Sequence, residues 1–204
     1  MRPLLAALAL LLPLNLHAAD KPQVVTSFSI LADLTQAIGG NHIELVNLVG
    51  ADEDAHVFEP SPEHAKALLK ADLIIANGLG FEPWLERLLD SSEARGKRID
   101  ASAGVLPLQL IEHGHSVPGP HAWQSLSNAE IYVRNIAKAL SQLDPSHSAD
   151  YAARRDAYLV RLQVLREQAN RQLNSLPASQ RKVVTSHDAF GYFADAYGIA
   201  FVSP

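Results

Sequence analysis

Residues 24–49, VVTSFSILADLTQAIGGNHIELVNLV, decide the fold that this sequence predicts. They begin with Val24–Ser27, which is predicted to be a buried strand. Apolar residues then take helical spacing from Ile30 to Ile38, and the helix is expected to end at Gly39-Gly40, a common C-terminal cap. Residues Ile43–Val49 alternate along the chain as a second strand does. The segment therefore predicts a strand, a helix and a strand in succession.

The same alternation continues beyond this segment. Ser61-Pro62-Glu63 is typical of a helix start, with a serine N-cap and proline at the first helical position, and this helix should reach about Ala71. We expect a third strand at Leu73–Ala76, a helix near residues 84–89 and a short fourth strand at Lys97–Asp100. Strands that alternate with helices in this way predict an α/β fold, with a parallel sheet covered by helices on both faces.

An unusually long helix is predicted in the second half of the chain. Residues 101–120 are rich in glycine and proline and are expected to form a loop, and a helix follows over about 128–143. From about residue 149 to 176, apolar residues recur at gaps of three, four or seven, which is helical spacing. At about 1.5 Å per residue this helix would be roughly 40 Å long. A coiled coil and an ordinary packing helix are the alternatives to a helix that joins two lobes.

The C-terminal residues begin a second α/β unit. Lys182–Ser186 is predicted to be a strand, residues 190–197 a helix and residues 199–202 a further strand. One such unit cannot cover its own apolar face. We therefore expect that the sequence is a fragment, or that another chain completes the fold.

Composition limits the classes of partner. The chain has 17 lysines and arginines against 22 aspartates and glutamates, a formal net charge of −5. Nucleic acids and anionic membranes both require a basic face, so neither is expected as a partner. There is no cysteine, which excludes thiolate metal ligands and disulfides and leaves the fold to its core and its ligands.

The N-terminus is typical of a targeting segment. Arg2 is followed by a leucine- and alanine-rich run from Leu4 to Leu16, and the small residues Ala18-Ala19 precede Asp20. The run is too short to cross a bilayer, which takes about 20 apolar residues. We predict that residues 1–19 are a cleaved secretory signal peptide, with a buried hydrophobic helix as the alternative.

Three of the nine histidines stand in distinctive peptides. His56 lies in AHVFEPSP (55–62), His121 in GPHAW (119–123) and His187 in TSHDAFGYF (185–193). Imidazole nitrogen is a preferred ligand of zinc, and three would supply most of a tetrahedral shell. His56 and His187 follow predicted strands, and ligands of doubly wound sheets bind beyond the carboxyl ends of strands. We therefore expect the three side chains to meet in a cleft.

These peptides closely resemble those of the metal-binding solute-binding proteins of bacterial ABC importers, the zinc/manganese ZnuA/TroA-like group. Residues 56–62 are similar to the family's His-x-x-x-Pro-Ser/Thr-Pro signature, and Pro-His-Ala-Trp is similar to its Pro-His-x-Trp element. The resemblance implies a two-lobed α/β protein: an N-terminal lobe over 20–147, a long linking helix over 148–177, and the start of a truncated C-terminal lobe at 178–204.

The resemblance also implies a function. It implies a soluble, monomeric periplasmic protein that captures Zn²⁺ with His56, His121 and His187 and delivers it to a membrane permease driven by an ATPase. The missing cysteine favours a free protein over a lipoprotein. Manganese binding, or an adhesin role, is an alternative within the family, in which manganese-binding members often carry a carboxylate in place of His187. A secreted zinc hydrolase is the alternative from another class, because three histidines and a water form a catalytic arrangement.

The fourth ligand is not evident in the sequence. The resemblance places an aspartate or glutamate beyond Pro204, whereas water, Glu59 or a histidine of the 101–120 loop are the candidates within the chain. We expect Glu59 to line the site without binding the metal. His113 and His115 either collect metal, in exchange with a metallochaperone, or lie in a solvated loop.

The neighbours of these histidines are predicted to have supporting roles. Asp188 is expected to cap the following helix or to orient an imidazole, and Trp123 and Phe190 to form walls of the site. The histidines without a distinctive peptide are expected to be structural or surface residues: His42, His64 and His147.

Overall fold

A four-stranded parallel sheet forms the centre of the molecule. The computed structural model describes residues 20–112 and 114–203, so the predicted signal peptide (1–19) and His113 lie outside the described residues. The strand order is β2-β1-β3-β4, and every pairing in this sheet is parallel. The strands are β1 (Gln23–Phe28), β2 (Glu44–Val49), β3 (Leu73–Ala76) and β4 (Lys97–Asp100).

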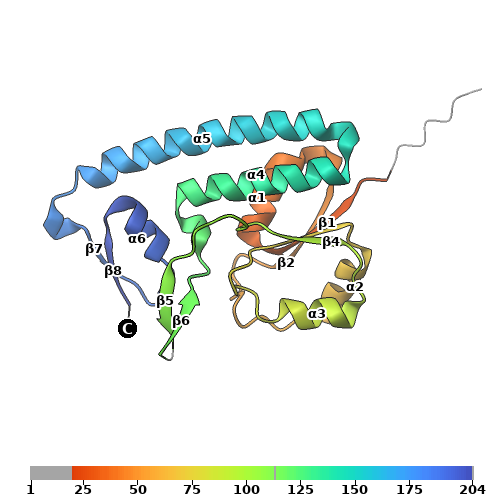
Figure 1. The fold of residues 1–204 in the computed structure, drawn as a ribbon, viewed down its shortest axis with the longest axis horizontal. Coiled ribbons are helices and arrows are strands. Elements are labelled where there is room, and N and C mark those ends of the chain that lie inside the picture. Colours follow the sequence, from red (N-terminus) through yellow and green to blue (C-terminus); the bar gives the residue numbers. More distant parts are fainter. Residues whose placement is uncertain (1–19, 113, 204) are drawn as a thin grey trace, which may run out of the picture.

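Helices cover both faces of this sheet, as the sequence predicts (Figure 1). On one face lie α1 (Ser29–Gly39), α4 (Leu126–Leu143) and α5 (Ser148–Asn174). On the other face lie α2 (Pro62–Lys70) and α3 (Leu85–Ser92). The strand order changes direction between β1 and β3, and ligands of open α/β sheets bind beyond the carboxyl ends of the strands at such a point.

The core explains the sequence pattern of the strands. All four residues of β3 and the last five of β1 are buried, because these two strands lie in the middle of the sheet with helices above and below. The edge strand β2 is instead alternately exposed and partly buried over its first four residues. Continuous burial therefore marks the central strands, including the polar Thr26 and Ser27 of β1, and alternating burial marks the edge strand β2.

The prediction of a loop over residues 101–120 is wrong in part. It contains an antiparallel hairpin of β5 (Gln109–Glu112) and β6 (His115–Pro118). Gly114 at the tip has a φ of +80°, which glycine adopts without strain. The strands have only four residues each and β6 ends in proline, so local composition resembles a loop although the two strands pair.

A second, smaller unit follows α5. It consists of β7 (Lys182–Val184), α6 (Gly191–Tyr197) and β8 (Ala200–Val202), with β7 and β8 parallel. Tyr192 of α6 joins this unit to the base of the hairpin: its hydroxyl accepts a hydrogen bond from the Leu108 amide (3.0 Å) and donates one to the Gly119 carbonyl (2.8 Å).

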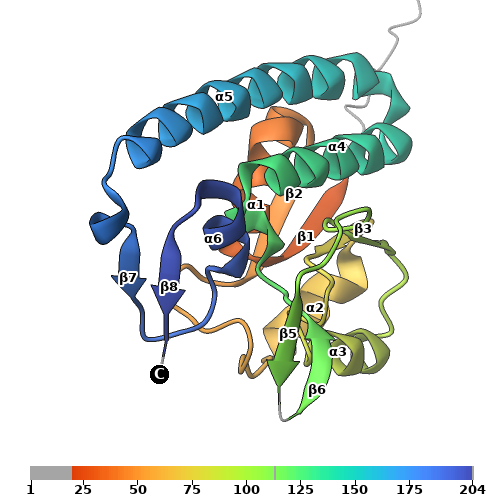
Figure 2. The ribbon, with the colours of Figure 1, turned by 60° about the vertical axis from the view of Figure 1, so that its left-hand side comes forward.

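The long helix α5 runs from the end of α4 to β7 (Figure 2). Its 27 residues agree with the predicted long helix, whereas the division of the chain into lobes at residues 147 and 177 stays a prediction. Tyr151 and Leu162 are its buried residues, and Val160 and Val164 are exposed. Among the residues described, neither α5 nor any other helix combines the length and apolar character needed to cross a membrane.

The close approach of β3 and β4 gives a test of the fold. A Cβ at residue 96, just before β4, would lie 2.3 Å from the carbonyl oxygen of Ala71. Gly96→Ala is therefore expected to lower the free energy of unfolding by about 1–3 kcal/mol in chemical denaturation. Gly191→Ala is the control, because its new Cβ would meet Leu108 at 3.7 Å, an ordinary contact. Equal stabilities of the two variants would contradict this packing.

Candidate metal centre

His56 is held by the loop between β2 and α2. The indole Nε1 of Trp84 donates a 2.6 Å hydrogen bond to the carbonyl of Ala55, the residue before His56. The backbone amide of His56 donates to the Asp54 carboxylate at 2.9 Å. These two bonds hold the carbonyl and the amide of the Ala55–His56 peptide, immediately before the His56 side chain, which is partly buried.

His121 is the most deeply buried of the three, with 7% of its surface exposed. It follows β6 and directly precedes a short 3₁₀ turn (Ala122–Gln124). Its ring lies edge-on to those of Phe81 and Trp123, with centroids 5.7 and 5.4 Å away. His187 comes from the smaller unit, in the loop after β7, and is exposed.

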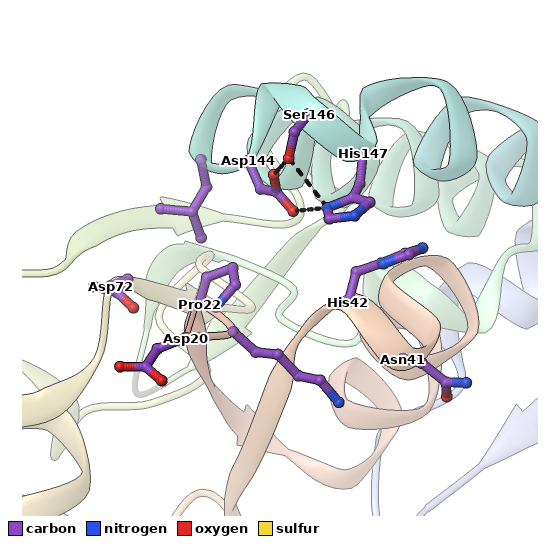
Figure 3. Close-up of a pocket in the computed structure, with 10 residues that line it drawn as sticks. Asp20, Pro22, Asn41, His42, Asp72, Asp144, Ser146 and His147 are labelled. Atoms are coloured by element: carbon purple, nitrogen blue, oxygen red, sulfur yellow. Dashed lines mark hydrogen bonds and ion pairs between the residues drawn. The ribbon is translucent and has the colours of Figure 1, made fainter. Parts of the chain in front are cut away.

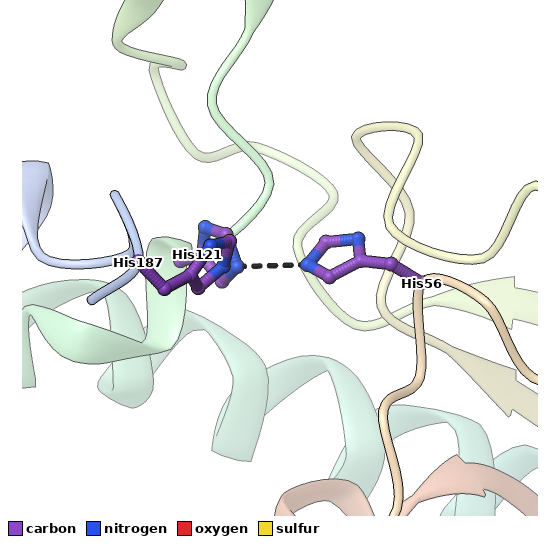
Figure 4. A group of neighbouring side chains, drawn as sticks. All are labelled: His56, His121 and His187. Carbon is purple, nitrogen blue, oxygen red and sulfur yellow. Dashed lines mark hydrogen bonds between the residues drawn. The ribbon is translucent and has the colours of Figure 1, made fainter. Parts of the chain in front are cut away.

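The three imidazoles converge, as the sequence predicts (Figure 4). His56 Nε2 and His121 Nε2 are 3.0 Å apart. The ring centroid of His187 lies 5.7 Å from that of His56 and 5.2 Å from that of His121. One nitrogen of each ring lies within 4.8 Å of a nitrogen of each other ring. Among the described residues, no other group of three or more histidine, aspartate or glutamate side chains brings its ligand atoms this close together.

This geometry is close to what a metal ion needs. Zinc–nitrogen bonds of about 2.0–2.1 Å in a tetrahedron place the nitrogens about 3.3 Å apart. The separation of 3.0 Å between the nitrogens of His56 and His121 is near this value. Two neutral imidazoles at this distance either share one hydrogen bond or direct their lone pairs at a common cation. The arrangement can therefore supply three of four tetrahedral ligands.

The electrostatic environment keeps His121 neutral. The pKa of His121 is lowered from 6.5 to about 4, chiefly by burial and also by the neighbouring His56 and His187, while Asp54 opposes the shift. A neutral imidazole is the form that coordinates a metal. The environment therefore favours the ligand form of His121 at neutral pH.

Two adjoining cavities, of about 450 and 460 Å³, open beside the imidazoles, and all three histidines line both. The carboxylates among the lining residues are those of Glu53, Asp54 and Asp188, and they do not include Glu59, which is exposed. The prediction that Glu59 lines the site is therefore wrong. Val57 and Glu59 after His56 are exposed, and the acidic residues before it line the cavities instead.

The predicted neighbours are confirmed in part. Trp123 lines one cavity, as predicted. Phe190 packs elsewhere: its ring stacks on Phe201 inside the smaller unit, with centroids 4.9 Å apart. The N-cap of α6 is Phe190, so the predicted capping role of Asp188 is wrong, and Asp188 lines a cavity beside His187.

The other described histidines have different surroundings. His64 belongs to the capping box of α2, in which its Nδ1 accepts a 2.9 Å hydrogen bond from the Ser61 amide. His42 and His147 line a separate cavity of about 610 Å³ beside the amino ends of the strands (Figure 3). Their rings stack at 3.9 Å, and each faces its own carboxylate, Asp150 for His42 (3.0 Å) and Asp144 for His147 (2.6 Å). All three make structural contacts, as predicted.

The fold is that of the metal-binding solute-binding proteins. The Mn-bound periplasmic metal binding protein from Candidatus Liberibacter asiaticus superposes with a TM-score of 0.82 at 32% identity, over 90% of this chain and 68% of that one. A zinc-bound deletion mutant of ZnuA superposes with a TM-score of 0.84 at 33% identity, over 90% of this chain and 70% of that one.

The chain belongs to the family described as "ZnuA: Zinc-uptake complex component A periplasmic", whose model matches residues 24–204. It is 37% identical over 190 residues to the manganese ABC transporter substrate-binding lipoprotein PsaA of Streptococcus pneumoniae, covering 89% of this chain. It is 36% identical over 181 residues to the iron-binding protein YfeA of Yersinia pestis, covering 88% of this chain. The chain spans 61% and 58% of the lengths of these two relatives.

The low pKa of His121 predicts how stability depends on pH. Because the folded pKa is about 4 and the unfolded one 6.5, the unfolded chain binds more protons between these values. The free energy of unfolding of the metal-free protein should therefore fall by about 3 kcal/mol, through this residue, as the pH drops from 6.5 to 4. Urea unfolding at pH 7 and pH 4 measures the change, and His121→Asn should reduce it. An identical pH dependence in that variant would contradict the prediction.

Proposed function

We propose that this protein is the metal-capturing component of an ABC importer and binds a divalent cation between His56, His121 and His187. The convergence of the three imidazole nitrogens within 4.8 Å supports this proposal above all. The ligands come from three loops that are far apart in the chain. A structural role for each histidine alone would not require this convergence.

Zinc is the cation that we propose. Three neutral nitrogen donors suit zinc, which is borderline-soft, better than manganese, which prefers carboxylate and water oxygen. Manganese is the second candidate, because PsaA of S. pneumoniae and MntA of Halalkalibacterium halodurans are both described as manganese proteins. Asp54 and Asp188 beside the imidazoles offer oxygen that such an ion would prefer.

The proposed role is binding and delivery rather than catalysis. A secreted hydrolase would need an activated water at the metal, and we propose instead that the remaining position is filled by a ligand outside residues 20–203. The proposed partners are a membrane permease and its ATPase, and the proposed location is the periplasm after removal of residues 1–19. A zinc titration with no turnover of ester, peptide or phosphate substrates would support binding over catalysis.

Removal of a ligand tests the site directly. His56→Ala and His187→Ala are expected to weaken zinc binding at least 100-fold in a competition titration with a chelator, because each leaves two imidazoles. The same titration with manganese measures the preference between the two ions, and zinc should bind more tightly to the wild type.

His42→Ala is the matched control, because His42, like His56, is a partly buried histidine, but it faces Asp150 and not the proposed site. It should bind zinc as the wild type does. Wild-type affinity in His56→Ala or in His187→Ala would refute the assignment of that ligand, and tighter manganese binding would overturn the proposed preference.

A further inference from the structure

The buried residue Asn77 holds the peptide that carries His121. It directly follows β3 and is fully buried. Its side-chain Nδ2 donates hydrogen bonds to the carbonyl of Pro120 and to that of Gly78, both at 2.9 Å. Pro120 immediately precedes His121, so the bond to its carbonyl fixes the peptide plane from which His121 begins.

A tyrosine hydroxyl selects the orientation of this amide. Tyr132 of α4 is fully buried, and its hydroxyl donates a 2.6 Å hydrogen bond to Asn77 Oδ1. An amide rotated by 180° would present its NH₂ group to that hydroxyl and its oxygen to the carbonyl of Pro120. Because two acceptors facing each other in a buried site lose a hydrogen bond, the flipped form is disfavoured.

The backbone of Asn77 is fixed as firmly as its side chain. The buried carboxylate of Glu82 accepts hydrogen bonds from the Asn77 amide (2.6 Å) and from the Ser27 hydroxyl (2.5 Å). Ser27 belongs to β1, so the network of Ser27, Glu82, Asn77 and Tyr132 connects β1, the end of β3 and α4. From this network, the hydrogen bond of Asn77 Nδ2 to the Pro120 carbonyl reaches the loop that carries His121.

We propose that Asn77 is a positioning residue for His121, and that Tyr132 acts through it by setting the sense of the amide. The proposal rests on the proposed function, in which His121 is a metal ligand. Asn77 meets the carbonyl before His121 and not its ring, so it holds the ligand's backbone in place while Trp123 and Phe81 flank the ring. Loss of a hydrogen bond to the ligating side chain itself typically lowers metal affinity by about 10–100-fold, and we expect a loss in this range when the peptide that carries His121 is released.

Three variants of the full chain test this role. Asn77→Ala removes both bonds of the amide, and Tyr132→Phe removes only the hydroxyl that orients it. Asn135→Ala is the matched control, because Asn135 lies on α4 as Tyr132 does, and its amide bridges two carbonyls as that of Asn77 does. These are the carbonyls of Ala101 and Ala103, both at 2.8 Å. It makes the same kind of bond to a loop that carries no proposed ligand.

Two measurements separate positioning from stability. The first is zinc affinity by chelator competition, in which we expect a 10–100-fold loss for Asn77→Ala, a smaller loss for Tyr132→Phe and no change for Asn135→Ala. The second, in the metal-free protein, is the nuclear Overhauser effect between the rings of His121 and Phe81, whose centroids are 5.7 Å apart. It should weaken in the first two variants only.

The outcomes distinguish this proposal from the proposed function. If the wild type binds neither zinc nor manganese, the proposed function fails. The nuclear Overhauser effect between His121 and Phe81 alone then decides whether Asn77 positions His121. If the wild type binds zinc, affinity within twofold of wild type in Asn77→Ala, or an equal loss in Asn135→Ala, overturns the positioning role. Should Asn77→Ala fail to fold, Tyr132→Phe decides: a loss supports the role, and unchanged affinity overturns it.

Discussion

Three imidazoles that face one another are held together by the loops that carry them, because they gain little from their own contact. Two neutral rings with nitrogens 3.0 Å apart share at most one hydrogen bond, and any protonated pair would repel. The rigid supports of each loop therefore maintain the cluster. Trp84 holds the carbonyl before His56, and Asn77 holds the carbonyl before His121. Both anchors act on the backbone one residue before the imidazole.

The parallel sheet explains why these anchors can lie side by side. The carboxyl ends of parallel strands share one edge of the sheet, so the loop after β2 and the turn after β3 start from the same edge, with β1 between them. His187 reaches the same place from the smaller sheet. Its unit is tied to the peptide around Gly119 through the hydroxyl of Tyr192. Gly119 is two residues from His121, so one short segment receives support from both units.

Much of the fold could be predicted from the sequence, because periodicity reports burial. The central strands, the edge strand and the long helix each have a distinct apolar pattern. The β5–β6 hairpin has no such pattern, since its pairing depends on two four-residue strands meeting across Gly114. The three histidines were predicted through their peptides, and spacing alone would not have shown that they meet. Asn77-Gly78 is a dipeptide typical of turns, and the local sequence does not indicate its role because the carbonyl that its amide meets lies 43 residues away.

The proposed preference for zinc depends on what surrounds the imidazoles as well as on their number. Three neutral ligands leave the charge of a divalent ion uncompensated, and a buried charge is stable only when an opposite charge is near. In the described residues, Asp54 and Asp188 lie at the cavity with the histidines. One carboxylate oxygen of Asp54 accepts a hydrogen bond from the His56 amide, and this bond holds the Asp54 carboxylate near the three histidines. An acidic residue in this position would stabilise a bound cation by electrostatics even where the direct ligands are nitrogen, so the three imidazoles and the carboxylates beside them can act together on a doubly charged ion.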